Sequence, residues 1–439
     1  MTNDGVLPEQ ADVRDGAPLA EAESAEIVAG AARTAHEAAG SLVAASADVV
    51  DAALRTMARR LLEVTTPVLA ANEEDLRDAE AAGTSGALLD RLRLGEERLE
   101  AMSAQLLALA DAPSDPSRRR IRSMHGNLVL EEWRRPVGVI GANFEARPNV
   151  VVDIASQLIK SRNAGVLRTG SAALRSAIGL VSHVIEPSLR DVGLDHRVIQ
   201  LIRVPGQQMA RALVRQPALL PLVILRGSGS STRTLAAEAA QCGVRTLAHA
   251  DGGAVIYVDD SADRQLVADL IEASLDRLGV CNRLNLLLVK DTIWQEMTAS
   301  TLPLLNRLGI TASLPPHDHE LGREWALETG REATVTITSV RGPAEAARIA
   351  NEQTSGLAAG VIAEDEDVVE EFLSSYIGTG AFHNATPRLL DGFKLFSIPE
   401  TGINLDRVPG PRGPVTFRDL YLRQVVVRPE TPTNSPATS

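Results

Sequence analysis

The spacing of apolar residues over the first quarter of the chain predicts helices. From Ser24 to about Ala110, apolar residues recur at roughly three-, four- or seven-residue intervals among alanine, glutamate and arginine, which is the pattern of one apolar helix face. We therefore expect a helical arm over residues 24–127. Residues 1–23 are acidic and lack an apolar period, so we expect a disordered tail there.

After Asp111–Ser117, which carries two prolines, the pattern changes to short apolar runs that alternate with helical segments. These runs are Val137–Gly141, Ala164–Leu167, Val198–Ile202, Leu222–Leu225, Ala254–Val258 and Leu284–Val289. Such alternation indicates βαβ units and a mostly parallel sheet. It restarts near Val258, so the sequence predicts two α/β lobes instead of one large sheet.

Two further segments have the pattern of strands, NLVLEEWRR (Asn127–Arg135) and LYLRQVVVRP (Leu420–Pro429). The second lies too close to the C-terminus to begin a new domain, so we expect it to pair with an earlier element. The basic run Arg118–Arg122 is expected to be a solvated loop, with a binding patch as the alternative.

Composition and charge narrow the class of protein. The chain has 439 residues, of which 44% are hydrophobic and 23% charged, close to the averages for globular proteins. A net charge of −13 argues against a nucleic-acid partner. The sequence holds no apolar run long enough for a membrane span, and its first residues lack the pattern of a signal peptide. We expect a cytoplasmic enzyme that acts on a small molecule, without a membrane or nucleic-acid partner.

Of the two cysteines, only Cys281 has a position that suggests chemistry. It lies in LGVCNRLNLLLV, on a turn that leads into an apolar strand, where a sheet protein exposes nucleophiles. The alternative is a buried cysteine that only packs. Cys242 lies near the end of an alanine-rich helix and is expected to be structural. The eight histidines show no metal-ligand spacing, so we expect no metal.

Polar residues also follow three of the predicted strands. Glu145, Arg147 and Asn149 come directly after one of them, and ligands of open α/β sheets bind outside the carboxyl ends of strands. Arg147 could hold a phosphate or carboxylate, and Asn149 could stabilise an oxyanion; a helix-capping cluster is the alternative. Two Gly/Ser turns that open helices, Arg168–Ser171 and Arg226–Gly229, suggest a nucleotide site, although neither matches an established phosphate-binding motif.

These residues resemble a known family. EEWRRPVGVIGANFEARPNVVVDIAS looks like the central signature of gamma-glutamyl phosphate reductase, in the aldehyde dehydrogenase superfamily. AANEEDLRDAEAAG resembles its N-terminal arm, VCN at Val280–Asn282 its nucleophile loop, and HNATPRLLDG and PRGPV its C-terminal motifs. The resemblance spans roughly residues 25–425.

The resemblance implies an aldehyde dehydrogenase-like α/β fold with two Rossmann-like lobes. These would be an NADP-binding lobe (128–255) and a catalytic lobe (256–385), followed by a return segment (386–428) and a disordered tail (429–439). Strands 128–134 and 419–427 would form a protruding hairpin that joins subunits into a homodimer or homotetramer.

The resemblance also implies a reaction. The Cys281 thiolate would attack L-glutamyl 5-phosphate or a close acyl-phosphate analogue, phosphate would leave, and NADPH would reduce the thioester to glutamate 5-semialdehyde. Asn149 would donate to the oxyanion. The implied substrate-binding residues are Glu145, Arg147, Asn282, Asn285, Glu400 and Arg412. The implied cofactor-binding residues are Arg168, Thr169, Gly170, Ser171, Arg226, Gly227, Ser228, Gly229, Gly252 and Gly253.

Several positions depart from the family pattern. Thr169-Gly170 replaces a double glycine, and Asn285 stands where a glutamate is usual. Ala250 replaces the water-activating glutamate of hydrolytic aldehyde dehydrogenases, which favours reduction over aldehyde oxidation. A primary role in proline biosynthesis and a specialised pathway both stay open. So do a CoA-acylating or aldehyde-oxidising enzyme and a weakly catalytic homologue that acts as partner of an amino-acid kinase.

Overall fold

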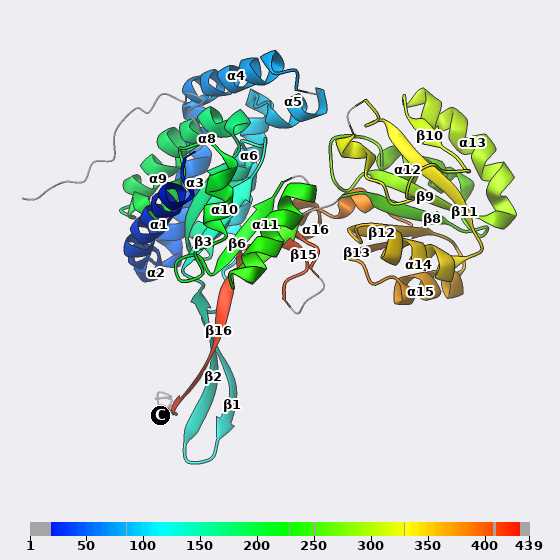
Figure 1. Cartoon of the computed structure of the whole chain (residues 1–439). Coiled ribbons are helices and arrows are strands. Elements are labelled where there is room, and N and C mark those ends of the chain that lie inside the picture. Colours follow the sequence, from blue (N-terminus) through cyan, green and yellow to red (C-terminus); the bar gives the residue numbers. More distant parts are fainter. Residues whose placement is uncertain are drawn as a thin grey trace, which may run out of the picture.

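The computed structural model describes residues 19–84, 86–227, 229–249, 252–328, 330–406 and 410–430 (Figure 1). It confirms two α/β lobes, with the helical arm packed on the first lobe and a long β-arm that protrudes from it. The expected disordered tails fall largely outside the described residues, as does Ser228. No helix of the described part is long and apolar enough to cross a membrane.

The first lobe is built on a five-stranded parallel sheet with the order β5-β4-β3-β6-β7. Its strands are β3 (Val139–Phe144), β4 (Ala164–Thr169), β5 (Ile199–Leu201), β6 (Leu222–Arg226) and β7 (Arg245–His249). Helices cover the sheet, so its strands are apolar on both faces. The covering helices are α7 (Val150–Lys160), α8 (Leu174–Leu180), α9 (Glu186–Asp191), α10 (Gln207–Leu213) and α11 (Gly229–Gln241). The chain leaves β3 toward β4 and returns on the other side at β6, which makes the β3/β6 boundary a topological switch point.

The second lobe holds a six-stranded parallel sheet with the order β10-β11-β9-β8-β12-β13. Its strands are β8 (Ala254–Val258), β9 (Leu284–Lys290), β10 (Thr311–Ser313), β11 (Thr334–Val340), β12 (Ala358–Ile362) and β13 (Gly380–His383). The helices around it are α12 (Arg264–Ala273), α13 (Trp294–Arg307), α14 (Pro343–Gln353) and α15 (Glu366–Ser375). Both sheets therefore follow the βαβ alternation that the sequence predicts.

The helical arm shares one continuous core with the first lobe. It comprises α1 (Glu21–Ala38), α2 (Gly40–Ala44), α3 (Ala47–Glu63), α4 (Thr65–Ala81), α5 (Gly86–Leu92) and α6 (Glu96–Asp111). Helix α1 begins inside the stretch that we expected to be disordered. The reason is that Val28, Ala32 and Ala35 are fully buried against the lobe, while Glu21 and Glu23 favour the positive end of the helix dipole.

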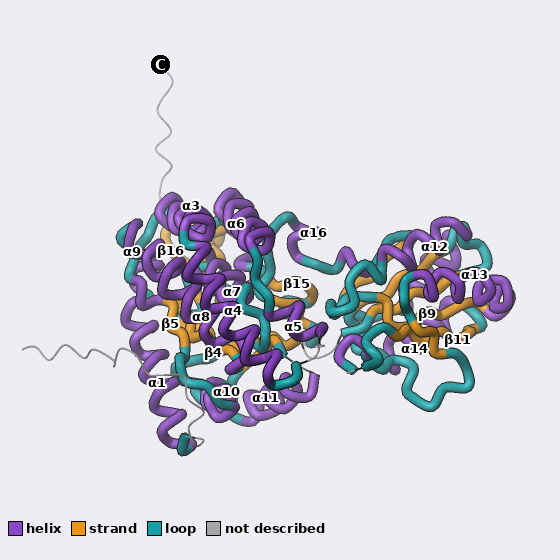
Figure 2. The backbone as a smooth tube through the Cα atoms, turned by 90° about the horizontal axis from the view of Figure 1, so that it is seen from above, coloured by secondary structure: helices purple, strands orange, loops and turns teal. Residues whose placement is uncertain are grey.

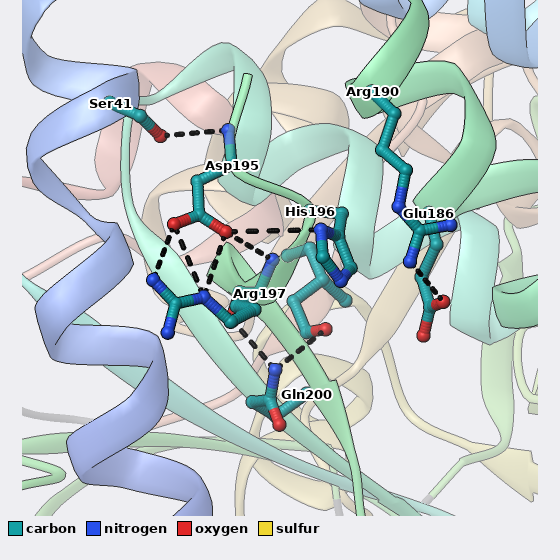
Figure 3. A network of polar contacts seen from close by, with 8 residues as sticks. Ser41, Glu186, Arg190, Asp195, His196, Arg197 and Gln200 are labelled. Atoms are coloured by element: carbon teal, nitrogen blue, oxygen red, sulfur yellow. Dashed lines mark hydrogen bonds and ion pairs between the residues drawn. The ribbon is translucent and has the colours of Figure 1, made fainter. Parts of the chain in front are cut away.

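A polar network fastens this arm to the edge of the first sheet (Figure 3). Asp195 donates its backbone N–H to the Ser41 hydroxyl on α2 (3.3 Å), and its carboxylate accepts from Arg197 Nη2 (2.8 Å) and from the Arg197 backbone N–H (2.9 Å). The Arg197 side chain holds the pKa of Asp195 below its usual value. The network therefore fixes the turn that leads into β5.

The β-arm is a three-stranded antiparallel sheet of β1 (Arg118–Met124), β2 (Leu128–Pro136) and β16 (Tyr421–Pro429). The pairing of β16 with β2 confirms that the C-terminal strand joins an earlier element. The prediction of a loop at Arg118–Arg122 is wrong, because these arginines lie on strand β1. The Arg118 guanidinium stacks on the Trp133 ring (4.0 Å), and Gly126 and Asn127 supply the positive φ angles that a tight hairpin turn requires.

The return segment leads from the second lobe back to the first. It contains α16 (Gly392–Phe396), β14 (Gly402–Asn404) and β15 (Gly413–Val415), and Figure 2 shows α16 and β15 between the lobes. Asn404 Oδ1 accepts the backbone N–H of Ala248 (3.2 Å), which fastens β14 beside β7. This brings the preceding residue Glu400 into the junction of the two lobes.

Candidate functional site

The candidate site lies where the carboxyl ends of the first-lobe strands meet the Cys281 loop of the second lobe. Cys281 precedes β9, and its carbonyl oxygen accepts the backbone N–H of Gly253 (2.6 Å). Its side chain packs against the small apolar cluster that contains Leu357 and Leu390. The structure thus supports the position of a nucleophile on a turn that leads into a strand.

Four charged groups act on this thiol. Burial raises the pKa of Cys281, Arg147 lowers it most among the charges, Arg226 and Arg91 lower it further, and Glu324 raises it. These groups come from four separate parts of the chain, so the electrostatic setting of the thiol depends on both lobes and on the helical arm. The net direction is a raised pKa, so the thiol is protonated at neutral pH in this structure.

Arg147 is a cation without a counter-ion. Among the residues that the structure describes, its guanidinium has neither a hydrogen bond nor an ion pair, while its backbone carbonyl accepts the N–H of Val150 (3.1 Å), and the residue is only partly exposed. Burial and the neighbouring Arg226 lower the pKa of Arg147 to about 10, so it stays charged at neutral pH. A half-buried, unpaired guanidinium beside a thiol fits a phosphate or carboxylate of a substrate.

Helix α5 of the arm reaches the same loop. Arg91 Nε donates to the carbonyl of Gly279 (2.9 Å), and Asp90 accepts from Arg277 Nη2 (2.7 Å). Helix α5 of the N-terminal arm thus fixes Arg277 and Gly279, which precede Cys281 in the chain. Sequence reasoning missed Arg91 on α5 and Arg277 in the loop after α12, because neither position has a sequence signal that separates it from a solvated arginine.

Two half-buried carboxyl groups complete the site on the first-lobe side. Burial raises the pKa of Glu400 to about 7, although Arg226 opposes the shift, and Glu400 accepts the backbone N–H of Gly392. Burial likewise raises the pKa of Asp153 to about 6, and Asp153 accepts from Asn149 Nδ2 (2.9 Å). Glu400 was predicted at the site, whereas Asp153 was missed.

The Asn149 side-chain amide contacts the helix that follows it, α7. Asn149 is the residue before α7, in agreement with the helix-capping alternative, but its side chain makes no bond to a backbone N–H at this end. It donates instead to Asp153, four residues along the chain. Its donation to an oxyanion stays a prediction.

The raised pKa of Glu400 predicts a pH dependence of stability. A carboxyl group whose pKa rises from 4.5 to about 7 on folding stabilises the fold below pH 4.5, and this contribution is lost as the pH rises through 7. For the Glu400→Gln variant we expect the fall in unfolding free energy between pH 5 and pH 8 to be smaller than in the wild type, by about 2–3 kcal/mol. Urea unfolding at four pH values measures it, and identical slopes in both proteins would contradict it.

Asn282 and Asn285, predicted to bind substrate, hydrogen-bond to neighbouring loops, and their contact with substrate stays a prediction. Asn282 is buried and donates to the carbonyl of Leu390 (3.0 Å) while it accepts from Arg388. Asn285 is buried and donates to the carbonyl of Arg323 (2.6 Å). Their amides thus hold neighbouring loops. Arg412, another predicted substrate-binding residue, is exposed and donates to the carbonyl of Ile377 (2.8 Å).

The first Gly/Ser turn differs from the prediction in its first two residues. Arg168 and Thr169 are buried, and the Arg168 guanidinium donates to Asn143 Oδ1 (2.9 Å) and to the carbonyl of Gly206 (2.8 Å). Arg168 therefore braces β4 and does not present its charge to a ligand. Gly170 has open space around it and Ser171 is exposed, so these two can face a cofactor.

The second turn brings Glu145 to the start of α11. The Ser231 hydroxyl donates to Glu145 Oε1 (3.1 Å), and a Cβ on Gly227 would lie 3.0 Å from the Glu145 carboxyl carbon. A negative group thus occupies the helix N-terminus at the β3/β6 switch point, where a cofactor phosphate is favoured. Gly229 lies buried in the first turn of α11. This end of the sheet fits a dinucleotide, with Arg226 and Gly227 beside it.

Gly252 and Gly253, predicted to bind the cofactor, contact the Cys281 loop and the Glu324 side chain, and their contact with a cofactor stays a prediction. Gly253 adopts a φ of +92° and donates to the carbonyl of Cys281, while Gly252 donates its N–H to Glu324 Oε2 (2.8 Å). A Cβ on Gly252 would lie 2.9 Å from the Cα of Cys281, so no larger residue fits there. Ala250 lies outside the described residues.

Comparisons with known proteins agree with this architecture. The aldehyde dehydrogenase family model matches residues 7–322. Gamma-glutamyl phosphate reductase of Clavibacter michiganensis is 33% identical over 421 residues, which are 93% of this chain and 94% of the relative. The crystal structure of gamma-glutamyl phosphate reductase from Thermotoga maritima has a TM-score of 0.81 at 27% identity and covers 91% of this chain and 98% of its own. An acetylating aldehyde dehydrogenase from Geobacillus thermoglucosidasius shares the fold, with a TM-score of 0.69 at 17% identity over 92% of this chain and 97% of its own.

Proposed function

The chain belongs to the gamma-glutamyl phosphate reductase branch of the aldehyde dehydrogenase family, and from this premise we propose that it reduces L-glutamyl 5-phosphate, or a close acyl-phosphate analogue, with NADPH. The products are glutamate 5-semialdehyde and phosphate. The observation that carries the proposal is the unpaired Arg147 beside Cys281, because an acyl phosphate needs a cation next to the nucleophile that attacks it.

The reaction begins with the attack of Cys281 Sγ on the acyl carbon. The new S–C bond forms a tetrahedral adduct, and the C–O bond to phosphate breaks to leave a thioester on Cys281. Arg147, with Arg226 nearby, stabilises the phosphate as it gains charge. NADPH, when bound, would supply the hydride that reduces the thioester to the aldehyde. Cys281 would leave as the thiolate and take up a proton from solvent to regenerate the thiol.

The proposed cofactor site runs along the carboxyl ends of β3, β4 and β6. The N-terminus of α11 favours the pyrophosphate, and Gly170 and Ser171 leave room beside it. The Glu145 carboxylate at this helix end must yield to a cofactor phosphate, because two anions cannot share the position. Glu145 is thus assigned to the cofactor side of the site.

The reverse reaction tests the proposal directly. With glutamate 5-semialdehyde, inorganic phosphate and NADP⁺, we expect NADPH formation that depends on phosphate. Activity that requires CoA instead of phosphate would indicate an acylating aldehyde dehydrogenase, and activity that requires neither would indicate aldehyde oxidation. Absence of NADP⁺ binding would refute the proposal and favour a weakly catalytic partner of the amino-acid kinase that makes the labile acyl phosphate.

We also propose that the β-arm joins subunits into a homodimer or homotetramer. Its edge strand β16 exposes Leu422, Val425 and Val427, and an apolar strand edge with unpaired backbone groups favours pairing with a second copy. A Val425→Lys/Val427→Lys variant is expected to elute at the monomer mass in light-scattering chromatography, with an unchanged circular dichroism spectrum. Val43→Lys, a matched substitution of an exposed valine on α2, should leave the mass unchanged. A variant that keeps the wild-type mass would exclude β16 as the contact.

A further inference from the structure

Glu324 lies in the segment between β10 and β11, which the second lobe holds rigidly. The residues on both sides of it are bonded to Asn285, which donates to the carbonyl of Arg323 (2.6 Å) and accepts the backbone N–H of Trp325 (3.1 Å). The Trp325 side chain is fully buried and donates to the Thr336 hydroxyl (2.9 Å). The backbone that carries Glu324 is therefore fixed to the sheet.

This segment places the Glu324 carboxylate against the nucleophile loop. Glu324 Oε2 accepts the backbone N–H of Gly252 (2.8 Å). A Cβ on Gly252 would collide with Glu324 Oε1 and would lie 2.8 Å from the carbonyl oxygen of Cys281 and 2.9 Å from its Cα. The Glu324 carboxylate and the backbone of Cys281 therefore lie on either side of the space that a Gly252 side chain would fill.

The charges around the Cys281 thiol and the Glu324 carboxylate favour proton transfer from the thiol to the carboxylate. Arg147, Arg226 and Arg91 face the thiol and favour its thiolate form, and Glu324 and burial favour the thiol. Glu324 also interacts with the cations Arg91 and Arg283 and favours their charged forms. A neutral thiol needs an acceptor for its proton when the sulfur attacks, and a neighbouring carboxylate is a group that can accept it.

We propose that Glu324 accepts the proton of Cys281 during acylation, which deepens and rests on the proposed reductase function. As the S–C bond forms, the S–H proton passes to the Glu324 carboxylate. It then passes to the phosphate oxygen as the C–O bond breaks, so hydrogen phosphate leaves and Glu324 is ionised again. The carboxylate occurs on a segment that sequence reasoning did not connect with Cys281.

The test separates the acidity of the thiol from catalysis, in a Cys242→Ser background so that Cys281 is the single cysteine. In Glu324→Gln the amide oxygen can still accept from Gly252, but the negative charge is gone. We expect iodoacetamide to alkylate Cys281 several-fold faster at pH 7, because the thiol pKa falls, while turnover falls about 100-fold. A merely structural role would not move the two rates in opposite directions.

Two further variants complete the test. Glu324→Asp should recover part of the turnover, and Glu320→Gln, which removes an exposed charge from the same segment, should match the parent in both rates. The pH at which alkylation reaches half its maximal rate, the alkylation midpoint, reports the pKa of the thiol. Turnover of Glu324→Gln within two-fold of the parent, or an unchanged alkylation midpoint, would overturn the proposal. If the parent itself shows no turnover, the reductase function has failed, and the shift of the alkylation midpoint alone decides whether Glu324 faces the thiol.

Discussion

Cys281→Ser is expected to abolish phosphate-dependent NADPH formation, with a loss of at least about 10⁴-fold in kcat. Serine is close to cysteine in size, so the loop that Gly253 bonds at the carbonyl of residue 281 is preserved. A hydroxyl is far less acidic than a thiol, and the arginines around it cannot supply the missing alkoxide. The thioester therefore does not form, and hydride transfer has no acyl acceptor.

The control for this variant is Cys242→Ser, at the end of α11 and remote from the Cys281 loop in sequence. It should keep wild-type kcat and KM. Both variants should bind NADP⁺ as the wild type does, measured by the quenching of tryptophan fluorescence. A Cys281→Ser enzyme with more than a tenth of the wild-type rate would refute covalent catalysis at this residue.

The overall architecture could be predicted because it depends on patterns that are local in sequence. The periodicity before Ala110 and the apolar runs after it identify the arm and the two lobes, and the orphan strand at Leu420–Pro429 requires a partner. Strand β1 escaped prediction because its residues are arginines, whose position on a strand is stabilised by Trp133 and by acidic residues across the sheet. Such cross-strand contacts leave no periodic signal.

The site could be predicted in part for the same reason. Cys281, Arg147 and Glu400 are found at the junction of the lobes because turns next to strands carry them there. The tasks of Asn285 and Arg168 depend on hydrogen bonds to distant loops, and those bonds are tertiary. Glu324 could not be predicted for the same reason, since no residue near it in sequence indicates that it lies close to the thiol.

The distribution of charge explains why the site needs both lobes. The cations Arg147 and Arg226 come from the first lobe, and the nucleophile and Glu324 come from the second. In the proposed reaction, the first lobe would attract an anionic substrate and the second would supply the group that attacks it. A substrate phosphate between them would offset the mutual repulsion of the arginines, which lowers the pKa of Arg147 in this structure.

Arg147→Ala is expected to lower kcat/KM for the acyl phosphate about 10³-fold, because it removes a charge-assisted contact to a phosphate in a poorly solvated site. In the reverse reaction the KM for inorganic phosphate should rise by a similar factor. Arg147→Lys should recover only part of the loss, since a lysine provides the charge without the bidentate geometry. Because the pKa of Arg147 is about 10, these differences should be the same at pH 6.5 and pH 8.

The matched control is Arg412→Ala, since Arg412 was also a substrate candidate but is exposed and bonded to Ile377. It should leave the KM for phosphate within two-fold of the wild type. Steady-state kinetics of both variants, with phosphate and aldehyde varied separately, distinguish a phosphate contact from a contact to the amino-acid carboxylate. If Arg147→Ala raises the KM for the aldehyde and leaves that for phosphate unchanged, Arg147 binds the carboxylate, and the phosphate depends on Arg226 alone.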